Sequence, residues 1–240
     1  MKLLVVIPTF NEAENLQPMI SALFSLYPEG LNILIVDDNS PDGTGVIADE
    51  LKLQFPGKLE VLHRMGKLGL GSAYIQGFQY GLDHGYEMIG QMDADFSHPP
   101  AKLVALIEAV NNGADVALGS RYIPGGSLDK NWPAWRKFLS GFGNLYARTI
   151  LNLPIKDVTG GFKVWSRAML EKMPLTTIRS NGYVFQVEMI YAATKLGCKT
   201  REIPFYFADR KFGKSKMSFR IQVEAALRVW RLLWIHKETK

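Results

Sequence analysis

The 240-residue sequence has little of several features that would assign it to a familiar class of protein. It contains one cysteine, Cys198, which excludes an internal disulfide and any metal site built from several cysteines. A lone thiol is most simply explained by a reducing compartment. No segment reaches the roughly 18 uninterrupted apolar residues that a membrane span needs. The apolar run 3–8 is too short for a signal peptide. We therefore expect neither a secretory leader nor a transmembrane helix.

The charge balance is only mildly basic. The chain has 28 Lys and Arg residues against 23 Asp and Glu, a formal net charge of +5. This excess suits an anionic small ligand or an anionic membrane surface, and it is too weak to indicate nucleic-acid binding. Apolar residues make up 47% of the chain and charged residues 21%, which is typical of a folded globular protein and excludes disorder as its main state.

Short apolar runs alternate with amphipathic segments along the first half of the chain. The runs lack polar alternation, so they predict buried strands whose two faces are covered by helices. We expect strands at 3–7, 32–36, 59–63, 88–92 and 115–118, and helices at 13–26, 45–54, 71–83 and 101–111. This order predicts an α/β fold with a mainly parallel central sheet flanked by helices.

The second half departs from this alternation. After a loop rich in glycine, the sequence predicts a helix at 135–151, a strand near 162–165, a helix near 185–195, a strand near 201–207 and a last helix at 219–234. We interpret residues 1–240 as one domain. Its first half (1–120) is predicted to bind a nucleotide, and its second half (121–218) is predicted to receive another substrate. A C-terminal amphipathic helix (219–240) follows.

Polar side chains gather where four predicted strands end. In open α/β sheets, ligands bind at the carboxyl ends of the strands. The segments at these ends are 8–12 (PTFNE), 37–44 (DDNSPDGT), 93–95 (DAD) and 119–122 (GSRY). Any one of them is equally well explained as a turn or a helix cap. All four together indicate a polar binding rim.

Two familiar nucleotide motifs do not fit their context. The dinucleotide fingerprint needs glycines after the first strand, and that turn contains none. The segment 213–215 (GKS) imitates the end of a P-loop, but Ala208 stands where the upstream glycine belongs. Asp93 and Asp95 fit a different task. Two carboxylates just past a buried strand can hold a hard divalent cation with positions left for water and phosphate oxygens.

The four rim segments resemble the family 2 glycosyltransferases of the GT-A fold. More narrowly, the chain resembles the polyprenol (dolichol) monophosphate mannose synthases of the soluble catalytic type. The segments specific to them are 122–126 (YIPGG), 157–162 (DVTGGF), 182–189 (GYVFQVEM) and 210–218 (RKFGKSKMS). The resemblance implies a dolichyl-phosphate β-D-mannosyltransferase. Such an enzyme moves mannose with inversion from GDP-mannose to a polyprenyl (dolichyl) phosphate and releases GDP.

The resemblance also implies the donor site. A divalent cation, Mg²⁺ or Mn²⁺, would lie on Asp93 and Asp95, with Ser97 as a weak neutral ligand. It would offset the charge that develops on the leaving diphosphate. The neighbouring His98 is interpreted as structural, because hard cations prefer oxygen. The implied contacts to the nucleotide sugar are Pro8, Phe10, Glu12, Asp37, Asp38, Asp93, Ala94, Asp95, Arg121, Arg210 and Lys216.

The acceptor side has a different requirement. A lipid phosphate is already anionic at pH 7, so it needs no general base, but it needs cations that hold it in line with the donor. The resemblance implies Arg121, Arg136 and Lys214 for the acceptor phosphate, and Asp95, Arg121 and Arg210 as catalytic residues. We further expect the segment 213–216 to close over the donor and exclude water.

A lipid acceptor implies contact with a membrane. The last helix is expected to carry Leu227, Trp230 and Trp234 on one face and arginines on the other, which suits a helix lying in a membrane interface. Packing of the apolar face on the catalytic sheet is the alternative, and a small membrane anchor subunit is another. We expect a cytoplasmic enzyme held peripherally at the cytoplasmic face of a membrane, with no nucleic-acid partner.

Two rival functions remain open at this stage. One is a family 2 transferase with another donor, which forms polyprenyl phosphate glucose or N-acetylglucosamine, or which extends a glycan. The other is a sugar-nucleotide-binding module without activity. The presence of Asp93, Asp95, Arg121 and Arg210 argues against the second rival.

Overall fold

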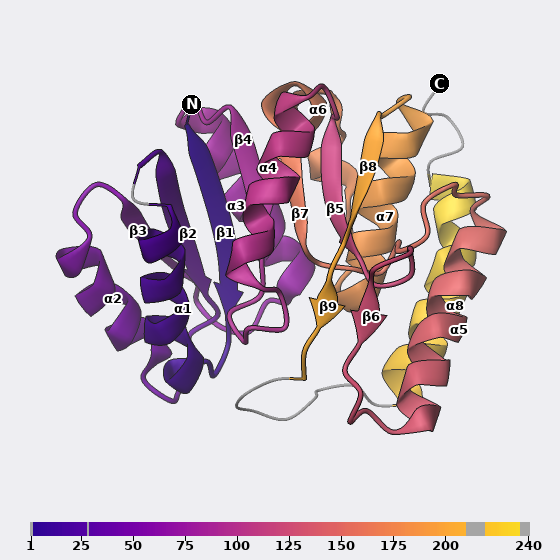
Figure 1. Ribbon diagram of the computed structural model, residues 1–240, viewed down its shortest axis with the longest axis horizontal. Helices are drawn as coiled ribbons and strands as arrows, with labels where there is room; N and C mark the ends of the chain where they lie inside the picture. The colour runs from indigo at the N-terminus through magenta and orange to yellow at the C-terminus, as the bar shows by residue number, and fades with distance from the viewer. Residues whose placement is uncertain (1, 28, 210–218, 236–240) are drawn as a thin grey trace.

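A central mixed sheet organises the protein (Figure 1). A computed structural model describes residues 2–27, 29–209 and 219–235. Within these residues the sheet has the strand order β3-β2-β1-β4-β7-β5-β8, and β6 pairs with β9 in a small second sheet. The strands are β1 (Leu3–Thr9), β2 (Leu31–Asp37), β3 (Leu59–His63), β4 (Met88–Gln91), β5 (Val116–Ser120), β6 (Ser127–Leu128), β7 (Lys163–Ser166), β8 (Thr200–Pro204) and β9 (Tyr206–Phe207).

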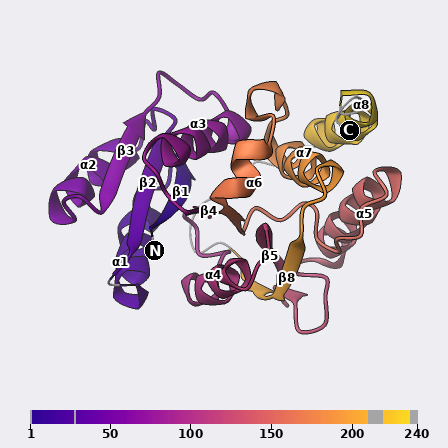
Figure 2. The same ribbon diagram turned by 90° about the horizontal axis from the view of Figure 1, so that it is seen from above.

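Helices cover both faces of the sheet (Figure 2). They are α1 (Ala13–Leu26), α2 (Thr44–Gln54), α3 (Leu70–Asp83), α4 (Leu103–Asn111), α5 (Ala134–Ile150), α6 (Arg167–Lys172), α7 (Gly182–Lys195) and α8 (Phe219–Ile235), with 3-10 turns η1 (Pro100–Lys102) and η2 (Leu175–Thr177). Alternation along β1 separates two cores. Leu4 and Val6 pack with α3 and α7, whereas Val5 and Ile7 pack with α1 and α4.

The predicted mainly parallel sheet is confirmed, with one antiparallel strand. The pairs β1–β2, β1–β4, β2–β3 and β5–β8 are parallel, while β7 runs antiparallel to both of its neighbours, β4 and β5. The strand β7 therefore brings a segment from the second half of the chain into the centre of the sheet. Its first residue, Lys163, pairs with Gln91 on one side and Leu118 on the other.

Most predicted elements are observed with shifted ends. The single strand predicted at 201–207 is two strands in the structure. Strand β8 ends at Pro204, and β9 begins at Tyr206. The helix predicted at 101–111 begins as the 3-10 turn η1. Strand β6 and helix α6 were not predicted, since two and six residues are too few to display a period.

The helix α3 lies unusually close to the sheet. A Cβ atom added at Gly77 would lie 2.3 Å from Cγ1 of Val6, and one added at Gly81 would lie 2.4 Å from Cδ1 of Ile89. Side chains at these two positions would therefore push α3 away from β1 and β4. The close contact helps to fix the strand ends that carry the candidate site.

Candidate functional site

The predicted rim residues that the structure describes lie at one edge of the sheet, the lower edge in Figure 1. The backbone turns sharply just after three of these strands. Asn11, Asn39 and Phe96 have φ of 59°, 55° and 62°, in the left-handed region that few residues other than glycine adopt. Such strain is often kept at functional sites. It is most unusual for the bulky Phe96, which stands between Asp95 and Ser97.

Asp37 and Asp38 are both buried at the end of β2. Asp37 accepts hydrogen bonds from the hydroxyls of Thr9, at 2.8 Å, and Ser40, at 2.6 Å, and from the Ser40 backbone N–H. These bonds join the ends of β1 and β2. Asp37 thus bonds to protein partners and holds the rim in shape.

Asp38 faces a buried arginine that the sequence analysis did not single out. The Nε atom of Arg64 lies 3.0 Å from Oδ1 of Asp38, and the other Asp38 oxygen accepts from the backbone N–H of Gly69. Arg64 also donates to Ser72 Oγ, at 2.7 Å, and to the Gly69 carbonyl. The pair holds the loop after β3 against the end of β2. Its only sequence signal is an arginine directly after a predicted strand.

The segment after β1 supplies Pro8, Phe10 and Glu12, all half-buried. The Nζ atom of Lys67 lies 4.2 Å from the centre of the Phe10 ring, a cation–π contact. Glu12 accepts a hydrogen bond from the Asn15 side chain at 2.9 Å. The aromatic face of Phe10 and the Glu12 carboxylate therefore border the same rim as Asp37 and Asp38.

The end of β4 presents the two predicted metal carboxylates. The Asp93 side chain is 35% exposed, and its Oδ1 atom accepts from the buried Tyr74 hydroxyl at 3.4 Å. Ala94 and Asp95 are buried. Oδ1 of Asp95 accepts from both the backbone N–H and the hydroxyl of Ser97, at 3.1 and 2.5 Å. Ser97 thus orients Asp95. Because the Ser97 hydroxyl is used for this bond, Ser97 is poorly placed to be a metal ligand.

Oxygen donors of this kind fit Mg²⁺ or Mn²⁺. The described residues contain no group of three or more His, Cys, Asp and Glu side chains that could hold a metal ion. A cation bound by Asp93 and Asp95 would therefore need further oxygens from water or from a phosphate ligand. That is the open coordination that a diphosphate-binding site requires.

His98 is structural, as the sequence analysis expected. Its Nδ1 atom accepts a hydrogen bond from the Asp93 backbone N–H at 3.0 Å, and its ring stacks on Phe162. Burial lowers the pKa of His98, although the charges of Asp93 and Asp95 act in the opposite direction. A neutral ring with Nδ1 already occupied fixes the turn after β4.

Arg121, predicted to contact phosphate, forms a buried ion pair with Asp157. Its Nε and Nη2 atoms each lie 2.7 Å from one carboxylate oxygen, and its backbone N–H donates to the same carboxylate. Burial acts to lower the pKa of Arg121, but the charge and hydrogen bonds of Asp157 raise it overall. The pKa of Asp157 is lowered, because Arg121 outweighs the effect of burial. Both groups therefore stay charged.

Arg136 lies at the start of α5, and its guanidinium carbon is 3.6 Å from the centre of the Trp132 ring. Its Nη1 atom pairs with Asp209 at 3.2 Å. Both partners are partly exposed, so a competing anion can displace the pair at little cost. Arg210, Lys214 and Lys216, together with the predicted closing segment 213–216, lie outside the described residues.

Lys163 is a buried lysine behind this edge of the sheet. Its Nζ atom donates to the Gly160 carbonyl and to Oε1 of Gln186. Burial lowers the pKa of Lys163 to about 7, against the opposing charge of Asp157. The residue pairs with no carboxylate within the part of the chain that the structure describes. Lys163 directly follows the motif 157–162 (DVTGGF), and the motif gave no signal that this lysine is buried.

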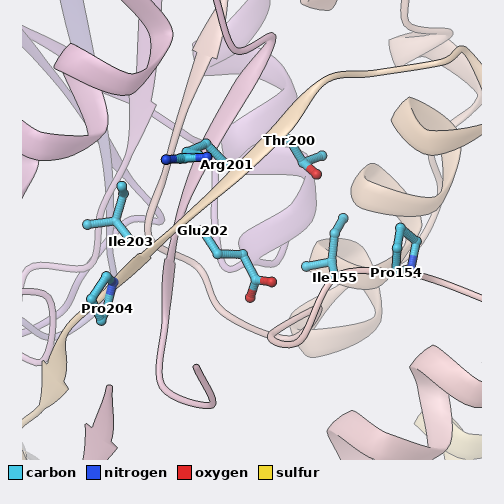
Figure 3. Close-up of a pocket in the computed structure, with 7 residues that line it drawn as sticks. All are labelled: Pro154, Ile155, Thr200, Arg201, Glu202, Ile203 and Pro204. Carbon is cyan, nitrogen blue, oxygen red and sulfur yellow. The ribbon is translucent and has the colours of Figure 1, made fainter. Parts of the chain in front are cut away.

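A shallow cavity of about 460 Å³ lies away from these residues, at the outer edge of β8 (Figure 3). Its lining includes Pro154, Ile155, Arg201 and Glu202 and contains none of the predicted site residues. Figure 3 shows Arg201 and Glu202 pointing to opposite sides of the strand. The Glu202 carboxylate accepts hydrogen bonds from the backbone N–H groups of Lys156 and Asp157. It therefore stabilises the loop that holds Arg121.

The helices α5 and α8 lie side by side at one end of the molecule (Figures 1 and 2). Together they carry an exposed apolar surface, called the aromatic surface below, formed by Trp135, Phe138, Phe142 and Leu145 of α5 and Leu227, Trp230, Trp234 and Ile235 of α8. In the described part of α8, Val229 and Leu232 face the core instead. Of the face predicted to be apolar, Trp230 and Trp234 are exposed, whereas Leu233 packs against the core.

No helix within the described ranges is long and apolar enough to cross a membrane. The aromatic surface is thus a property of two amphipathic helices. It is held together by Tyr146 of α5, whose hydroxyl donates to the Ala226 carbonyl and accepts from Trp230 Nε1 at 2.8 Å.

Comparison with known proteins identifies relatives over almost the whole chain. It is 46% identical to a polyprenol monophosphomannose synthase of Mycolicibacterium smegmatis over 90% of this chain and 80% of that protein. It is 45% identical to an undecaprenyl-phosphate mannosyltransferase of Micrococcus luteus, over 96% of this chain and 93% of the other. A dolichol-phosphate mannosyltransferase of Pyrococcus furiosus is 37% identical, and the match covers 97% of this chain and 64% of that longer protein.

Solved structures support the fold. A glucosyl-3-phosphoglycerate synthase from Mycobacterium tuberculosis, in complex with Mn²⁺, UDP and glucosyl-3-phosphoglycerate, superposes with a TM-score of 0.68 at 17% identity, over 97% of this chain and 78% of that one. A mannosyl-3-phosphoglycerate synthase from Rubrobacter xylanophilus gives 0.69 at 19% identity, over 97% and 74%. The predicted GT-A fold is confirmed. Residues 4–173 match the model of glycosyl transferase family 2, and the chain belongs to this family.

Proposed function

We propose that this protein is a polyprenyl-phosphate mannosyltransferase. The observation that carries the proposal is the identity of 45–46%, over 90% or more of the chain, with relatives named for mannose transfer to polyprenyl phosphates. The site has the parts that such a reaction needs. Asp93 and Asp95 follow β4, polar side chains line the ends of β1 and β2, and Arg121 follows β5.

The donor is proposed to be GDP-mannose. Its nucleotide would lie along the ends of β1 and β2, against Pro8, the Phe10 ring and Glu12, with Asp37 and Asp38 behind. Asp38 is the better candidate for a direct contact, since its Oδ1 atom, although 3.0 Å from Arg64 Nε, lacks a well-oriented hydrogen bond within the described structure. Donor N–H groups on a base or hydroxyls on a ribose could supply it.

A divalent cation is proposed to lie on Asp93 and Asp95, next to Ala94. When bound, it would neutralise charge on the diphosphate as the sugar–phosphate bond breaks. The protein contributes the orientation of its ligands. Tyr74 holds Asp93, and Ser97 holds Asp95, by hydrogen bonds on either side of the left-handed turn at Phe96. Pre-oriented carboxylates avoid the cost of reorganisation during the reaction.

The acceptor phosphate is proposed to bind Arg121 and Arg136, with Lys214 beyond the described residues. A phosphate monoester is already an anionic nucleophile, so no carboxylate has to act as a base on this side. Arg121 has a fixed guanidinium, and Arg136 can exchange its exposed Asp209 partner for phosphate. Together they would hold the attacking oxygen opposite the diphosphate and offset the repulsion between the two anions.

Membrane attachment is proposed to use the aromatic surface. Trp135 and Arg136 are adjacent at the start of α5, so a lipid whose phosphate reaches Arg136 would have its chain beside the first exposed aromatic ring of that helix. Tryptophans with nearby arginines are typical of membrane interfaces. A peripheral enzyme at the cytoplasmic face follows from this proposal, and a separate small anchor subunit is the alternative.

The test is a transfer assay with purified protein, Mg²⁺ or Mn²⁺ and a short-chain polyprenyl phosphate. Four donors are compared, GDP-mannose, GDP-glucose, UDP-glucose and UDP-N-acetylglucosamine, and the lipid products are identified by mass spectrometry. The proposal predicts mannosyl phosphate lipid from GDP-mannose at a rate far above the other three. Transfer from a uridine donor instead would identify the rival polyprenyl-phosphate transferase.

A further inference from the structure

The motif 157–162 (DVTGGF), which the proposed reaction leaves without a role, surrounds Arg121. Asp157 is fully buried and takes up the whole Nε–Nη2 edge of the guanidinium. The remaining hydrogen of Nη2 goes to Thr159 Oγ1 at 2.8 Å. Within the described structure, Nη1 is the guanidinium nitrogen that makes no hydrogen bond. The motif therefore fixes the plane of Arg121 and leaves one nitrogen for a ligand.

Two side chains from distant elements hold the backbone around Asp157. Glu202 of β8 accepts the N–H groups of Lys156 and Asp157 at 2.9 and 3.0 Å. Asn144 of α5 accepts the N–H of Val158 at 2.8 Å and donates to the Lys156 carbonyl. Three successive N–H groups are thus bound by side chains. The loop cannot rotate Asp157 away from Arg121 without breaking several hydrogen bonds, of which the one from Val158 is buried.

Charge explains why such a pairing is compatible with anion binding. Asp157 alone would cancel the charge of Arg121 and weaken its attraction for a phosphate. Lys163, buried behind the same loop and bonded to the Gly160 carbonyl, adds a second positive group. When Lys163 is protonated, Arg121, Asp157 and Lys163 together carry a net charge of +1. The guanidinium is thereby fixed in orientation, and the site as a whole still attracts an anion.

We propose that Asp157, held by Glu202 and Asn144, is a positioning residue that aims Nη1 of Arg121 at the acceptor phosphate. The inference rests on the proposed acceptor role of Arg121. It extends that role to the loop that carries Asp157 and to the edge strand β8. It takes Arg121 as an acceptor contact and not as the donor contact that the resemblance also implied, so it makes a selective demand: disturbing Asp157 should impair use of the acceptor and spare binding of the donor.

The experiment measures KM for a water-soluble short-chain polyprenyl phosphate, KM for the nucleotide-sugar donor, and kcat. Asp157→Asn keeps the shape of the side chain but offers one acceptor oxygen in place of two. We expect its acceptor KM to rise at least tenfold with the donor KM within twofold. Glu202→Gln, which loses one of two backbone contacts, should fold normally and raise the acceptor KM several-fold. It keeps the test decisive if Asp157→Asn does not fold.

The matched control is Glu60→Gln. Glu60 lies on β3, the opposite edge strand of the same sheet, and pairs there with Lys52. This variant should keep all three kinetic constants of the wild type. An equal rise of donor KM and acceptor KM in the Asp157 or Glu202 variants would overturn the inference, because general loosening of the fold would explain it.

Arg121→Lys separates this inference from the proposed function. If Arg121→Lys leaves the acceptor KM unchanged, the acceptor role of Arg121 is wrong and the inference falls with it. If Arg121→Lys raises the acceptor KM but Asp157→Asn and Glu202→Gln do not, only the positioning role is wrong. In the double variant Arg121→Lys, Asp157→Asn, the two effects should not multiply, since Asp157 acts through Arg121.

Discussion

Two side chains after β4, Asp93 and Asp95, are the proposed ligands of a divalent cation. Asp95 is oriented by two hydrogen bonds from Ser97 and is almost fully buried. A buried carboxylate held in this way has a fixed orientation. This makes Asp95 the most informative residue for the proposed metal site.

Asp95→Asn should abolish most of the activity without unfolding the protein. The amide oxygen still accepts from Ser97, but the charge that attracts the cation is lost, so the rate should fall by about 100-fold or more. Mn²⁺ binding in the presence of GDP, followed by calorimetry, should weaken in parallel, while thermal stability stays close to that of the wild type. A wild-type rate that is unchanged by EDTA would contradict the metal role.

Lys163 should make stability depend on pH. Its pKa is about 7 in the folded protein and near the usual lysine value when unfolded, so the unfolded state binds more protons between these limits. The charges of Asp157, Arg121 and Asp93 act on Lys163, and the charge of Lys163 in turn lowers the pKa of His98. The free energy of unfolding should therefore rise with pH above about 7, by at most about 1.4 kcal/mol per pH unit.

Urea unfolding of the wild type and Lys163→Met, at pH values from about 7 to 9, measures this contribution. The free energy of unfolding of Lys163→Met should not rise in this way. The wild type should therefore gain stability relative to the variant as the pH increases. Lys52→Met, at an exposed lysine, is the control and should keep the wild-type slope. Parallel curves for the wild type and Lys163→Met would contradict the buried, weakly basic lysine.

At the level of secondary structure, the sequence predicted the elements better than their arrangement. The apolar runs of β1 to β5 have the length and composition of buried strands, and their order alone implied a parallel sheet. The insertion of β7 between β4 and β5 had no such signal. It depends on the pairing of Lys163 with Gln91 and Leu118, both more than 40 residues away along the chain.

The close approach of α3 to the sheet gives a stability prediction. In Gly77→Ala, the new methyl group would overlap Val6, and we expect a cost of about 1–3 kcal/mol in the free energy of unfolding. Gly143→Ala, also in a helix but with no heavy atom within 4 Å of the added Cβ, is the control and should be neutral or stabilising. Equal stability of the two variants in urea unfolding would contradict the tight α3 packing.

The aromatic surface of α5 and α8 gives a membrane prediction. The protein should co-sediment with liposomes that contain anionic lipid, and less so at high salt, because apolar insertion and charge attraction both contribute. Replacing Trp230 and Trp234 by serine should weaken binding without unfolding, since both are exposed. Leu53→Ser, at an exposed leucine of α2, should bind as the wild type does. A wild type that ignores such liposomes at low salt would favour a separate anchor.

Across the whole molecule, the residues on the rim were predictable and their partners were not. Asp37, Asp38, Asp93 and Asp95 follow strands and belong to short local motifs, so a parallel sheet must bring them to one edge. The pairing of Arg121 with Asp157 joins residues 36 positions apart. It depends on where the loop before β7 crosses the edge, and nothing local encodes this. Arg64 escaped prediction for a similar reason, since its role depends on contact with Asp38.

The three-part division of the chain remains a functional prediction that the sheet does not mirror. The strands β7 and β8 belong to the proposed acceptor half, yet they pair with β4 and β5 of the donor half. The residues proposed for the donor and for the acceptor are therefore carried by one continuous sheet. Such a scaffold holds Asp93 and Arg121 at a fixed spacing without needing a hinge between two bodies.

The central claim is that the rim transfers mannose from GDP-mannose to a polyprenyl phosphate, and one measurement tests it most directly. Purified protein is incubated with GDP-mannose, Mn²⁺ and a short-chain polyprenyl phosphate, and GDP and mannosyl lipid are quantified together by mass spectrometry. The account predicts equal amounts of the two products, formed by the wild type and nearly absent with Asp95→Asn. GDP released without mannosyl lipid, or lipid glycosylated only from a uridine donor, would contradict it.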